Sequence, residues 1–547
     1  MGSRMGRPEK AKERTMKPPV QVLFPIGHEA KLQRSLQNAS QTVSINVDIC
    51  QKKCPKCNAI TFLNKCPKCG THTEIQKICT ICKGLYNKEE NICPKCQKVL
   101  VNSSVKKISF KKYLESALQN IHKTIPTIKG VKGMTSEYKI PEPLEKGILR
   151  AINKVWVYKD GTIRADATDI PLTHFNCNEI GVSVEKIKEL GYDVDIHGKP
   201  IVSGSQIIEL KVQDVLLTEH LGDYFVRVSK FVDDELEYLY HKPRFYNIRE
   251  RNQLIGHYMA GLAPHTSAAI IGRLIGFTKA ESGYAHPYWH AAKRRNADGD
   301  EDGIMLLLDC LLNFSKYYLP SSLGGKMDAP LVISLLLDPL EVDSESHNVD
   351  YISRYPLKFY LDSQKYVKPT EMGEYMDLFK DHLRTESQFE GSMYTHPTKS
   401  INLGPHKSAY SLFKTMDEKI ESQLYLARII TAVYEQEVAK KIISSHFAPD
   451  ILGNLRAFST QTFRCVKCGE KYRRIPLSGK CTKCKGKLLL TVNSGGIKKY
   501  LPKAQQLIKD FNLGAYTEQR WKLIERNVQS LCDNPKIKQQ TIASFFK

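Results

Sequence analysis

The chain has 547 residues, with 81 Lys and Arg against 58 Asp and Glu, which gives a formal net charge of +23. This length suggests about three or four domains at ~150 residues each. A charge this positive points to a polyanionic partner, for which nucleic acid is the default. An anionic membrane surface is the competing partner, but no apolar run approaches the ~20 residues of a spanning helix. The first residues also lack the apolar core of a secretory signal, so we expect a soluble, cytoplasmic protein with no membrane partner.

The first part of the chain alternates short apolar runs with polar segments. Residues 1–20 are polar and basic, and 20-VQVLFPIG-27 is typical of a buried strand that ends in a turn. Apolar residues recur with helical spacing over 106–122. Residues 150–215 mix short β-rich runs with turn residues, and 209–240 predicts a strand followed by a helix.

The second part of the chain is richer in helical patterns. Residues 303–318 are apolar on most helical faces, which predicts a buried helix, and 328–339 predicts a strand. A long amphipathic helix is predicted over 417–445, with one apolar face formed by Leu424, Leu426, Ile429, Val433 and Val438. Two further helices are predicted over 501–512 and over 521-WKLIERNVQSL-531.

The cysteines supply a regular pattern of possible metal ligands. Twelve of the sixteen form C-x-x-C pairs, namely Cys54/Cys57, Cys66/Cys69, Cys79/Cys82, Cys93/Cys96, Cys465/Cys468 and Cys481/Cys484. Each pair aims two thiolates at one point, and two pairs complete a tetrahedron around Zn²⁺. Disulfides are the alternative, but the regular spacing without a secretory signal favours zinc. Four cysteines per ion predict three zinc sites, which are structural because four thiolates leave no open position for a substrate.

The first eight cysteines can be grouped in two ways. We predict sequential grouping, with one site at 54–69 and the next at 79–96, while interleaved grouping stays open. Cys50 is a competing ligand for the first site. The other three unpaired cysteines are expected to be buried small residues; they are Cys177, Cys310 and Cys532.

The stretch 293-KRRNADGDEDGIM-305 places three cations directly before four carboxylates. The acids lie within five residues, where like charges repel and folding gains nothing from crowding them. A solvated acidic turn is the simplest interpretation. An EF-hand calcium loop is another, because Asp298, Asp300, Asp302, Gly303 and Asp309 match part of its pattern. Against calcium, Leu306 offers no side-chain oxygen and Pro287 breaks the helix that should precede the loop.

Catalytic magnesium is the interpretation that we prefer for this acidic loop. Asp298 and Asp300 flank a glycine, and side chains two residues apart share a face of an extended segment. Two carboxylates that converge on Mg²⁺ would neutralise a phosphoryl group during in-line displacement. Lys293, Arg294 and Arg295 are predicted to hold nucleic-acid phosphates. The loop therefore indicates a metal-dependent nucleotidyl transferase.

The C-terminal residues 539-QQTIASFFK-547 fit the pattern Q-x-x-h-x-x-a-a, in which h is apolar and a is aromatic. The four positions are supplied by Gln539, Ile542, Phe545 and Phe546. A short 3₁₀ turn would bring the apolar side chains onto one side, as a plug for a hydrophobic pocket. The tail is therefore predicted to bind a sliding clamp.

Seven stretches resemble the large, catalytic subunit of the archaeal D-family replicative DNA polymerase. They are 5-MGRPEKAKER-14, 22-VLFPIG-27, 209-ELKVQDV-215, 261-GLAPHTSAAIIGRLIGFT-278, 286-HPYWHAAKRRNADGDED-302, 324-GGKMDAPLV-332 and 343-DSESHN-348. The resemblance implies a multidomain, mixed α and β chain whose catalytic core is two double-psi β-barrels, as in multisubunit RNA polymerases. One barrel would carry the acidic loop and the other the basic residues, with zinc ribbons and helical accessory segments around them.

The resemblance also implies roles for single residues. Asp298 and Asp300 are similar to the metal-binding aspartates of the family, and Asn296 is similar to their neighbour in the site. Lys10 and Lys12 resemble residues of the first barrel that lie near the phosphates. From the residues alone, a disordered basic terminus is the simpler interpretation of these two lysines.

In the family the GRPEKA stretch lies in mid-chain, whereas here it stands at the start. The chain thus resembles the C-terminal half of the subunit, either as one piece of a split subunit or as a shortened chain. The implied partners are primer–template DNA with dNTPs, the small exonuclease subunit, the N-terminal half of the large subunit and a sliding clamp. The implied location is the cytoplasm, at the nucleoid.

The predicted domains follow these features in chain order. They are part of the first barrel (1–48), two zinc modules of four cysteines each (49–105), a connecting region (106–205), the second barrel with the acidic loop (206–400), a helical region (401–455), a third zinc ribbon (456–495), a helical C-terminal region (496–534) and the clamp-binding tail (535–547). Two other functions stay open, an RNA-polymerase-like nucleotidyl transferase and a non-catalytic, zinc-rich nucleic-acid scaffold. The acidic loop does not distinguish dNTPs from NTPs.

Overall fold

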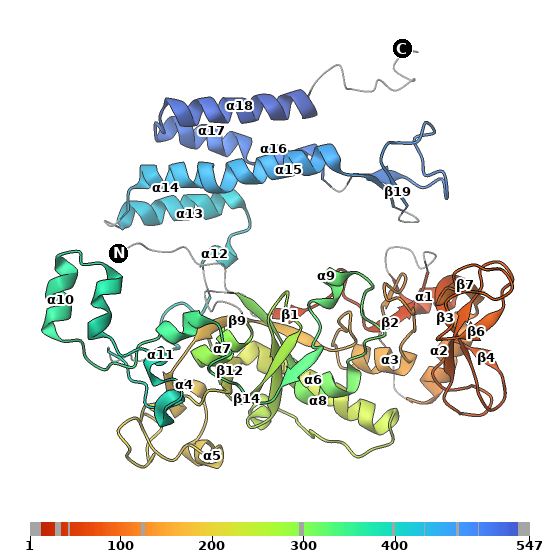
Figure 1. Ribbon diagram of the computed structural model, residues 1–547, viewed down its shortest axis with the longest axis horizontal. Coiled ribbons are helices and arrows are strands. Elements are labelled where there is room, and N and C mark those ends of the chain that lie inside the picture. The colour runs from red at the N-terminus through yellow and green to blue at the C-terminus, as the bar shows by residue number, and fades with distance from the viewer. Residues whose placement is uncertain are drawn as a thin grey trace. The chain divides into compact units, whose positions relative to one another are not determined.

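The computed structural model describes residues 12–27, 34–41, 44–121, 126–294, 300–395, 400–407, 409–430, 433–466, 470–490 and 492–533. These residues separate into two compact units, one within residues 6–408 and one from residue 409 onward, and each combines helices and strands (Figure 1). None of the described helices has the length and apolar character needed to cross a membrane.

The larger unit is built on a closed ring of six strands. In pairing order they are β9 (Arg164–Pro171), β15 (Gly283–Ala285), β12 (Asp214–Thr218), β14 (Ala268–Thr278), β13 (Tyr258–Leu262) and β16 (Glu301–Leu306), and β16 pairs back onto β9. The β9–β15 and β12–β14 pairs are parallel, and the other four are antiparallel. Nearly every residue of β12, β14 and β16 is buried, which explains their almost continuous apolar sequences.

Helices cover the ring. The longest, α6 (Glu219–Tyr238), begins where the Thr218 hydroxyl accepts a hydrogen bond from the Leu221 N–H. Gly222 permits its close approach to β14, because a Cβ there would lie 2.5 Å from the Phe277 ring. Shorter helices of this unit include α3 (Leu144–Ile152), α4 (Cys177–Ile180), α5 (Val184–Glu189), α7 (Pro287–Ala292), α8 (Leu307–Asn313), α9 (Leu323–Lys326), α10 (Leu357–Gln364) and α11 (Phe379–His382).

The predicted helix over 303–318 is wrong at both ends. Residues up to Leu306 belong to β16, and only Leu307–Asn313 are helical. The run GIML is apolar throughout, so periodicity cannot separate a buried strand from a buried helix. These residues form a strand because they pair with β13 on one side and with β9 on the other. The ring also uses β9, which precedes residue 206.

The N-terminal part of this unit adds two features. β1 (Lys12–Arg14) pairs with β9, and β2 (Val22–Pro25) pairs with β8 (Gly130–Val131). The buried strand predicted at 20–27 is thus confirmed as β2. Within the described residues the strand pairings close one ring.

A five-stranded sheet carries the first two cysteine modules. Its strands are β3 (Ile45–Lys53), β4 (Ile60–Thr61), β5 (Glu74–Ile78), β6 (Leu85–Asn87) and β7 (Ser103–Ile108). The helix predicted at 106–122 is α2 (Phe110–Gln119), because β7 pairs along β3 and takes the first of those residues. The strand predicted at 328–339 is only β17 (Val332–Ser334), a short addition to β14.

The C-terminal unit is mainly helical. Its helices include α13 (Met416–Ile429), α14 (Glu435–Lys441), α15 (Ala448–Thr460), α16 (Ser494–Lys498), α17 (Leu501–Asp510) and α18 (Ala515–Cys532), and a small sheet joins β18 (Phe463–Cys465), β19 (Lys471–Tyr472) and β20 (Leu488–Leu489). The predicted helices near 501–512 and 521–531 are confirmed as α17 and α18.

The single helix predicted over 417–445 is wrong. Helix α13 ends at an extended Ile430, and α14 begins at Glu435. The buried stripe of α13 is Ile420, Leu424 and Ala427, whereas Leu426 and Ile429 are 46% and 59% exposed. A stripe at i, i+4 and i+7 faces the core, and the prediction included apolar residues outside it.

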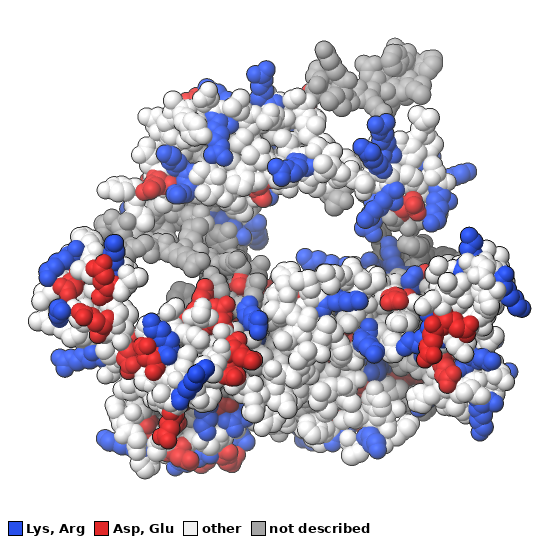
Figure 2. Space-filling model, in the orientation of Figure 1, with Lys and Arg blue, Asp and Glu red and all other residues white. Residues whose placement is uncertain are grey.

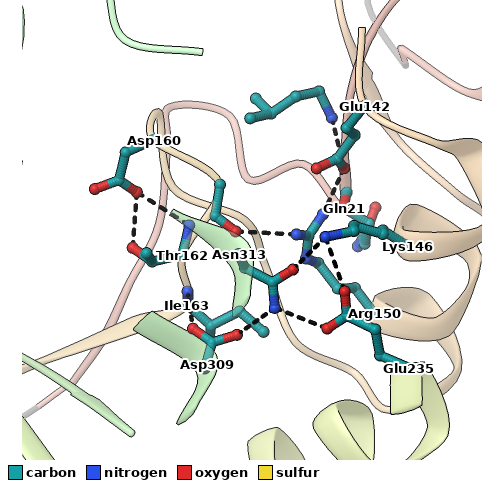
Figure 3. Close-up of polar contacts among 12 residues, drawn as sticks. Gln21, Glu142, Lys146, Arg150, Asp160, Thr162, Ile163, Glu235, Asp309 and Asn313 are labelled. Atoms are coloured by element: carbon teal, nitrogen blue, oxygen red, sulfur yellow. Dashed lines mark hydrogen bonds and ion pairs between the residues drawn. The ribbon is translucent and has the colours of Figure 1, made fainter. Parts of the chain in front are cut away.

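A buried polar network joins α3, α6 and α8 to the segment before β9 (Figure 3). Lys146 Nζ lies 2.8 Å from Glu235 Oε1 and 2.6 Å from Asn313 Oδ1. Asn313 donates through Nδ2 to Glu235 and to Asp309, at 2.8 and 2.9 Å. Asp309 also accepts from the Ile163 N–H at 2.8 Å. Burial, together with Glu235, raises the pKa of Asp309 to about 7.

This pKa shift predicts how the stability of the larger unit changes with pH. Between about pH 4 and pH 7 the native Asp309 holds a proton that the unfolded chain has lost, so stability falls as pH rises through this window. The destabilisation caused by ionising the buried Asp309 carboxyl is fully present above its folded pKa. Asp309→Asn removes this titration. Relative to wild type, the variant should therefore gain about 2–3 kcal/mol between pH 5 and pH 7. Urea unfolding at both pH values measures the difference, and parallel profiles would contradict the prediction.

Candidate metal and nucleic-acid site

The acidic loop leads directly into β16. Asp300, just before that strand, is 7% exposed, and its backbone oxygen accepts a hydrogen bond of 2.8 Å from the Asp169 N–H on β9. Of the three acidic-loop residues predicted to act in the site, only Asp300 is described. Asn296 and Asp298 lie outside the described residues, as does Arg295.

Lys293 ends up inside the protein rather than on its surface. Its Nζ contacts Asp169 Oδ2 at 3.2 Å and His290 Nδ1 at 3.3 Å, and it forms an ion pair with Asp302. The side chain is 0% exposed, so it cannot reach a phosphate, and the predicted nucleic-acid contact of Lys293 is corrected to an internal one. Arg294, the next residue, is exposed and remains available for that role.

The charges in this buried cluster follow from its contacts. Burial lowers the pKa of Lys293 to about 8, and Asp169 opposes that shift. Burial would raise the pKa of Asp169, but Lys293 and His290 together hold it below its ordinary value. His290 donates from Nε2 to the Ile170 carbonyl at 3.0 Å, and its Nδ1 lies 3.3 Å from both Asp169 Oδ2 and Lys293 Nζ.

The basic N-terminal segment lies on the other edge of β9. The backbone of Lys12 pairs with Asp166, and Asp166 also pairs with Gly303 of β16. Arg14 Nη1 lies 3.4 Å from Asp166 Oδ1. Positions 12 and 303 are therefore separated by one strand, although the chain between them is long. Lys10 lies outside the described residues.

Asp166, Asp169, His290 and Asp302 were not predicted as site residues. The available signal was the run 164-RADATDIP-171, in which charged residues interrupt a β-like segment. Such residues are costly to bury without partners. The partners come from α7 and β16, far along the sequence, so the run alone could not identify them.

The structure excludes the EF-hand alternative over its described part. Residues 301–306 form a strand, and Asp302 turns inward to Lys293. Asp309 lies in α8, with its carboxylate held by Ile163 and Asn313. These oxygens do not converge on one ion.

The cysteines converge in three clusters. In the first, Cys54 Sγ lies 3.4 Å from Cys69 Sγ, and Cys57 Sγ lies 3.5 Å from Cys66 Sγ. The first two clusters are Cys54, Cys57, Cys66, Cys69 and Cys79, Cys82, Cys93, Cys96, each with ligand atoms within 4.8 Å of one another. The sequential grouping is thus confirmed. The third cluster contains Cys465, Cys481 and Cys484, and Cys468 lies outside the described residues.

The five C-x-x-C pairs whose turns are described share one backbone geometry. The residue after the second cysteine has positive φ at Asn58, Gly70, Lys83, Gln97 and Lys485. Its N–H donates to the carbonyl of the first cysteine, at 2.8–3.1 Å. Such a turn points both thiols to one side. Four thiolates at these spacings are a donor set that fits zinc.

Hydroxyl groups approach the cysteine sulfurs in each cluster. Tyr86 Oη lies 3.1 Å from Cys93 Sγ, and Tyr472 Oη lies 3.1 Å from Cys481 Sγ. Thr71 Oγ1 lies 3.4 Å from Cys69 Sγ. Cys50 does not join the first cluster. Its Sγ lies 3.7 Å from the Phe62 carbonyl, and burial raises its pKa to about 11.

Lys and Arg side chains are distributed over the visible faces of both units (Figure 2), in keeping with the net charge of +23. The fold and the site together define a basic, mixed α/β protein in which a closed strand ring carries buried carboxylates and cysteine clusters have zinc-binding geometry.

Comparison with known proteins identifies the family. Residues 121–419 match the catalytic domain of the DNA polymerase II large subunit DP2, and residues 1–88 match its central domain. The chain belongs to this family. It is 49% identical to the DNA polymerase II large subunit of Methanocella arvoryzae over 100% of its own length and 49% of the relative's. It is 52% identical to the DNA polymerase II large subunit of Pyrococcus furiosus, over 97% of this chain and 43% of the relative. It is 49% identical to that of Archaeoglobus fulgidus, over 100% of this chain and 48% of the relative. The chain thus spans about half the length of these relatives.

Proposed function

We propose that this chain is the catalytic portion of a DNA polymerase large subunit, which adds dNMP to a primer 3′-OH during DNA replication. The observation that carries the proposal is that β9 lies between the basic segment at Lys12 and Arg14, which pairs with one of its edges, and β16, the strand that follows Asp300, which pairs with the other. Acids for metal and cations for phosphate are what nucleotidyl transfer requires. The family relationship supports the same conclusion.

The residue roles follow from this chemistry. Asp298 and Asp300 hold Mg²⁺, with Asn296 beside them, and bound Mg²⁺ would neutralise charge on the reacting phosphates. Lys10 and Lys12 are proposed to act near those phosphates. Arg294 and Arg295 bind the DNA backbone. Lys293 is removed from this group because its side chain is buried.

We further propose that the six-stranded ring is the double-psi barrel of the acidic loop. Its two parallel strand pairs, β9–β15 and β12–β14, support this proposal. We also propose the domain boundaries predicted for the zinc modules, the helical regions and the C-terminal tail.

The three cysteine clusters are proposed to hold three structural Zn²⁺. Their convergent sulfurs and shared turn geometry support this assignment. The proposed partners are primer–template DNA and dNTPs, the small exonuclease subunit, the N-terminal half of the large subunit and a sliding clamp. The proposed location is the cytoplasm, at the nucleoid.

Primer extension by the chain together with its subunit partners tests the function. Extension with dNTPs and not with NTPs is the expected result. Extension with NTPs would favour the RNA-polymerase-like alternative. DNA binding without extension by either nucleotide set would favour the scaffold, and the proposed function would then fail.

The tail supplies a prediction of its own, although residues 539–547 lie outside the described residues. Phe545→Ala with Phe546→Ala should abolish stimulation by the clamp and leave clamp-free synthesis intact. Burying each of the apolar side chains Ile542, Phe545 and Phe546 is worth roughly 1.5–3 kcal/mol before ordering costs. Extension of long templates with and without clamp measures the effect. Full clamp response in the double variant would exclude the tail, and loss of clamp-free synthesis would make the phenylalanines part of the fold.

A further inference from the structure

Lys293 and Asp302 stand at the two ends of the segment that carries the acidic loop, and their side chains meet inside the protein. They form an ion pair in which both side chains are 0% exposed. The Lys293 ammonium also contacts Asp169 Oδ2 and His290 Nδ1, at 3.2 and 3.3 Å. The Trp289 ring covers it, with the centroid 3.7 Å from Nζ. Lys293 is therefore enclosed by groups of the protein itself.

This enclosure gives the buried charges defined partners. An isolated buried carboxylate or ammonium is strongly unfavourable, whereas a paired one with further hydrogen bonds is tolerated. Asp302 meets Lys293 through Oδ2, and among the described residues its buried Oδ1 has no hydrogen-bond partner. The ion pair is thus the polar contact that the structure gives the Asp302 carboxylate.

The cluster is connected to Asp300 through Asp169. The Asp169 carboxylate binds Lys293, and the Asp169 N–H donates to the Asp300 carbonyl at 2.8 Å. Asp300 is also separated from Asp302 by one residue at the start of β16. A displacement of Lys293 would therefore shift Asp300 in two ways, through its hydrogen bond with Asp169 of β9 and through the backbone that links it to Asp302 of β16.

We propose that Lys293 is a positioning residue that, through its contacts with Asp169 and Asp302, holds Asp300 where it binds metal. This inference rests on the proposed function. It also explains the dense acids, because the internal cation neutralises Asp302, whereas Asp298 and Asp300 are the proposed metal ligands. Lys293 of the KRR run thus has a structural role, whereas Arg294 and Arg295 remain available to bind nucleic acid.

Primer extension at varied Mg²⁺ tests the proposal with Lys293→Met and, as the matched control, Arg294→Met. Lys293→Met should raise the Mg²⁺ concentration for half-maximal rate about tenfold and lower kcat by about 10–100-fold, the range for residues that orient metal ligands. Arg294→Met removes an exposed charge next to it. This control should raise KM for primer–template and leave the Mg²⁺ dependence unchanged. A loss of folded protein alone would lower the amplitude without moving the Mg²⁺ midpoint.

Asp302→Asn is the second variant, because Lys293→Met leaves two buried carboxylates and could fail to fold. It keeps Lys293 paired with Asp169 and should shift the Mg²⁺ midpoint in the same direction. Unchanged Mg²⁺ dependence in both folded variants would overturn the positioning role while wild-type extension upholds the function. If the wild type extends no primer, the function fails, and Mn²⁺ binding by electron paramagnetic resonance still tests the role. Weaker Mn²⁺ binding in Asp302→Asn than in wild type would support it, and equal binding would overturn it.

Discussion

Asp300→Asn should abolish nucleotide addition while primer–template binding stays within about twofold of wild type. The substitution keeps the size of the side chain and removes the charge that is proposed to bind Mg²⁺. Metal stabilisation of the transition state is worth several kcal/mol, so the rate should fall at least about 1,000-fold. The backbone hydrogen bond from Asp169 to Asp300 does not depend on the side chain and should persist. Single-turnover primer extension and fluorescence anisotropy measure the two quantities.

Glu301→Gln is the matched control for this experiment. Glu301 is the next carboxylate in the chain, it is only half-buried, and it is assigned no role in the site. Its substitution should change the extension rate by less than about threefold, as expected for a charge that acts only at a distance through water. Near wild-type extension by a folded Asp300→Asn variant would refute the assignment of Asp300. Equal losses in both variants would indicate a general effect of loop charge instead.

Cys93→Ser should remove one of the three expected zinc equivalents and unfold the module around residues 79–96. Cys93 is buried, and its sulfur lies in the cluster with Cys79, Cys82 and Cys96. The small apolar group of Cys79, Cys93 and Leu100 is too limited to hold the module without metal. Metal binding in such modules is coupled to folding. Elemental analysis and amide hydrogen exchange of the purified chain should show both changes.

Two substitutions serve as controls for the zinc experiment. Cys50→Ala should keep all the zinc, because Cys50 lies in the core beside Phe62 and outside the cluster. Tyr86→Phe should keep the stoichiometry but release zinc about tenfold faster, because the hydroxyl that contacts Cys93 is lost. Loss of a zinc equivalent on Cys50→Ala would restore Cys50 as a ligand. Full zinc content in Cys93→Ser would refute the module.

Local patterns predicted the features that depend on neighbouring residues. The spacing of the C-x-x-C pairs predicted turns that each bring two thiols together, but it left interleaved grouping open until the fold showed two sequential clusters. The run 20-VQVLFPIG-27 predicted β2, and the apolar periodicity near the C-terminus predicted α17 and α18. The turns and the helices depend on contacts within their own segments, whereas β2 was recognisable from its apolar run although its partner β8 lies far along the chain.

Features that depend on distant partners were predicted less well. The GIML run reads equally as strand or helix, and pairing with β13 and β9 makes it β16. Helix α13 stops at Ile430, where a continuous apolar pattern predicted more helix. Three-dimensional packing decided both, since burial depends on what faces a segment.

Lys293 shows the same division at the level of one side chain. Its place in KRR, beside two arginines, predicted a solvent-exposed cation for phosphate. The chain itself determined that a dense acidic loop follows three cations, and hence that metal and nucleic acid are its expected ligands. Only the closure of the ring decided which cation turns inward, because Asp169 arrives from β9, 124 residues away, and makes a buried ammonium favourable there. The sequence determines which side chains are charged, whereas the packed fold determines which of them are buried and which are exposed to solvent.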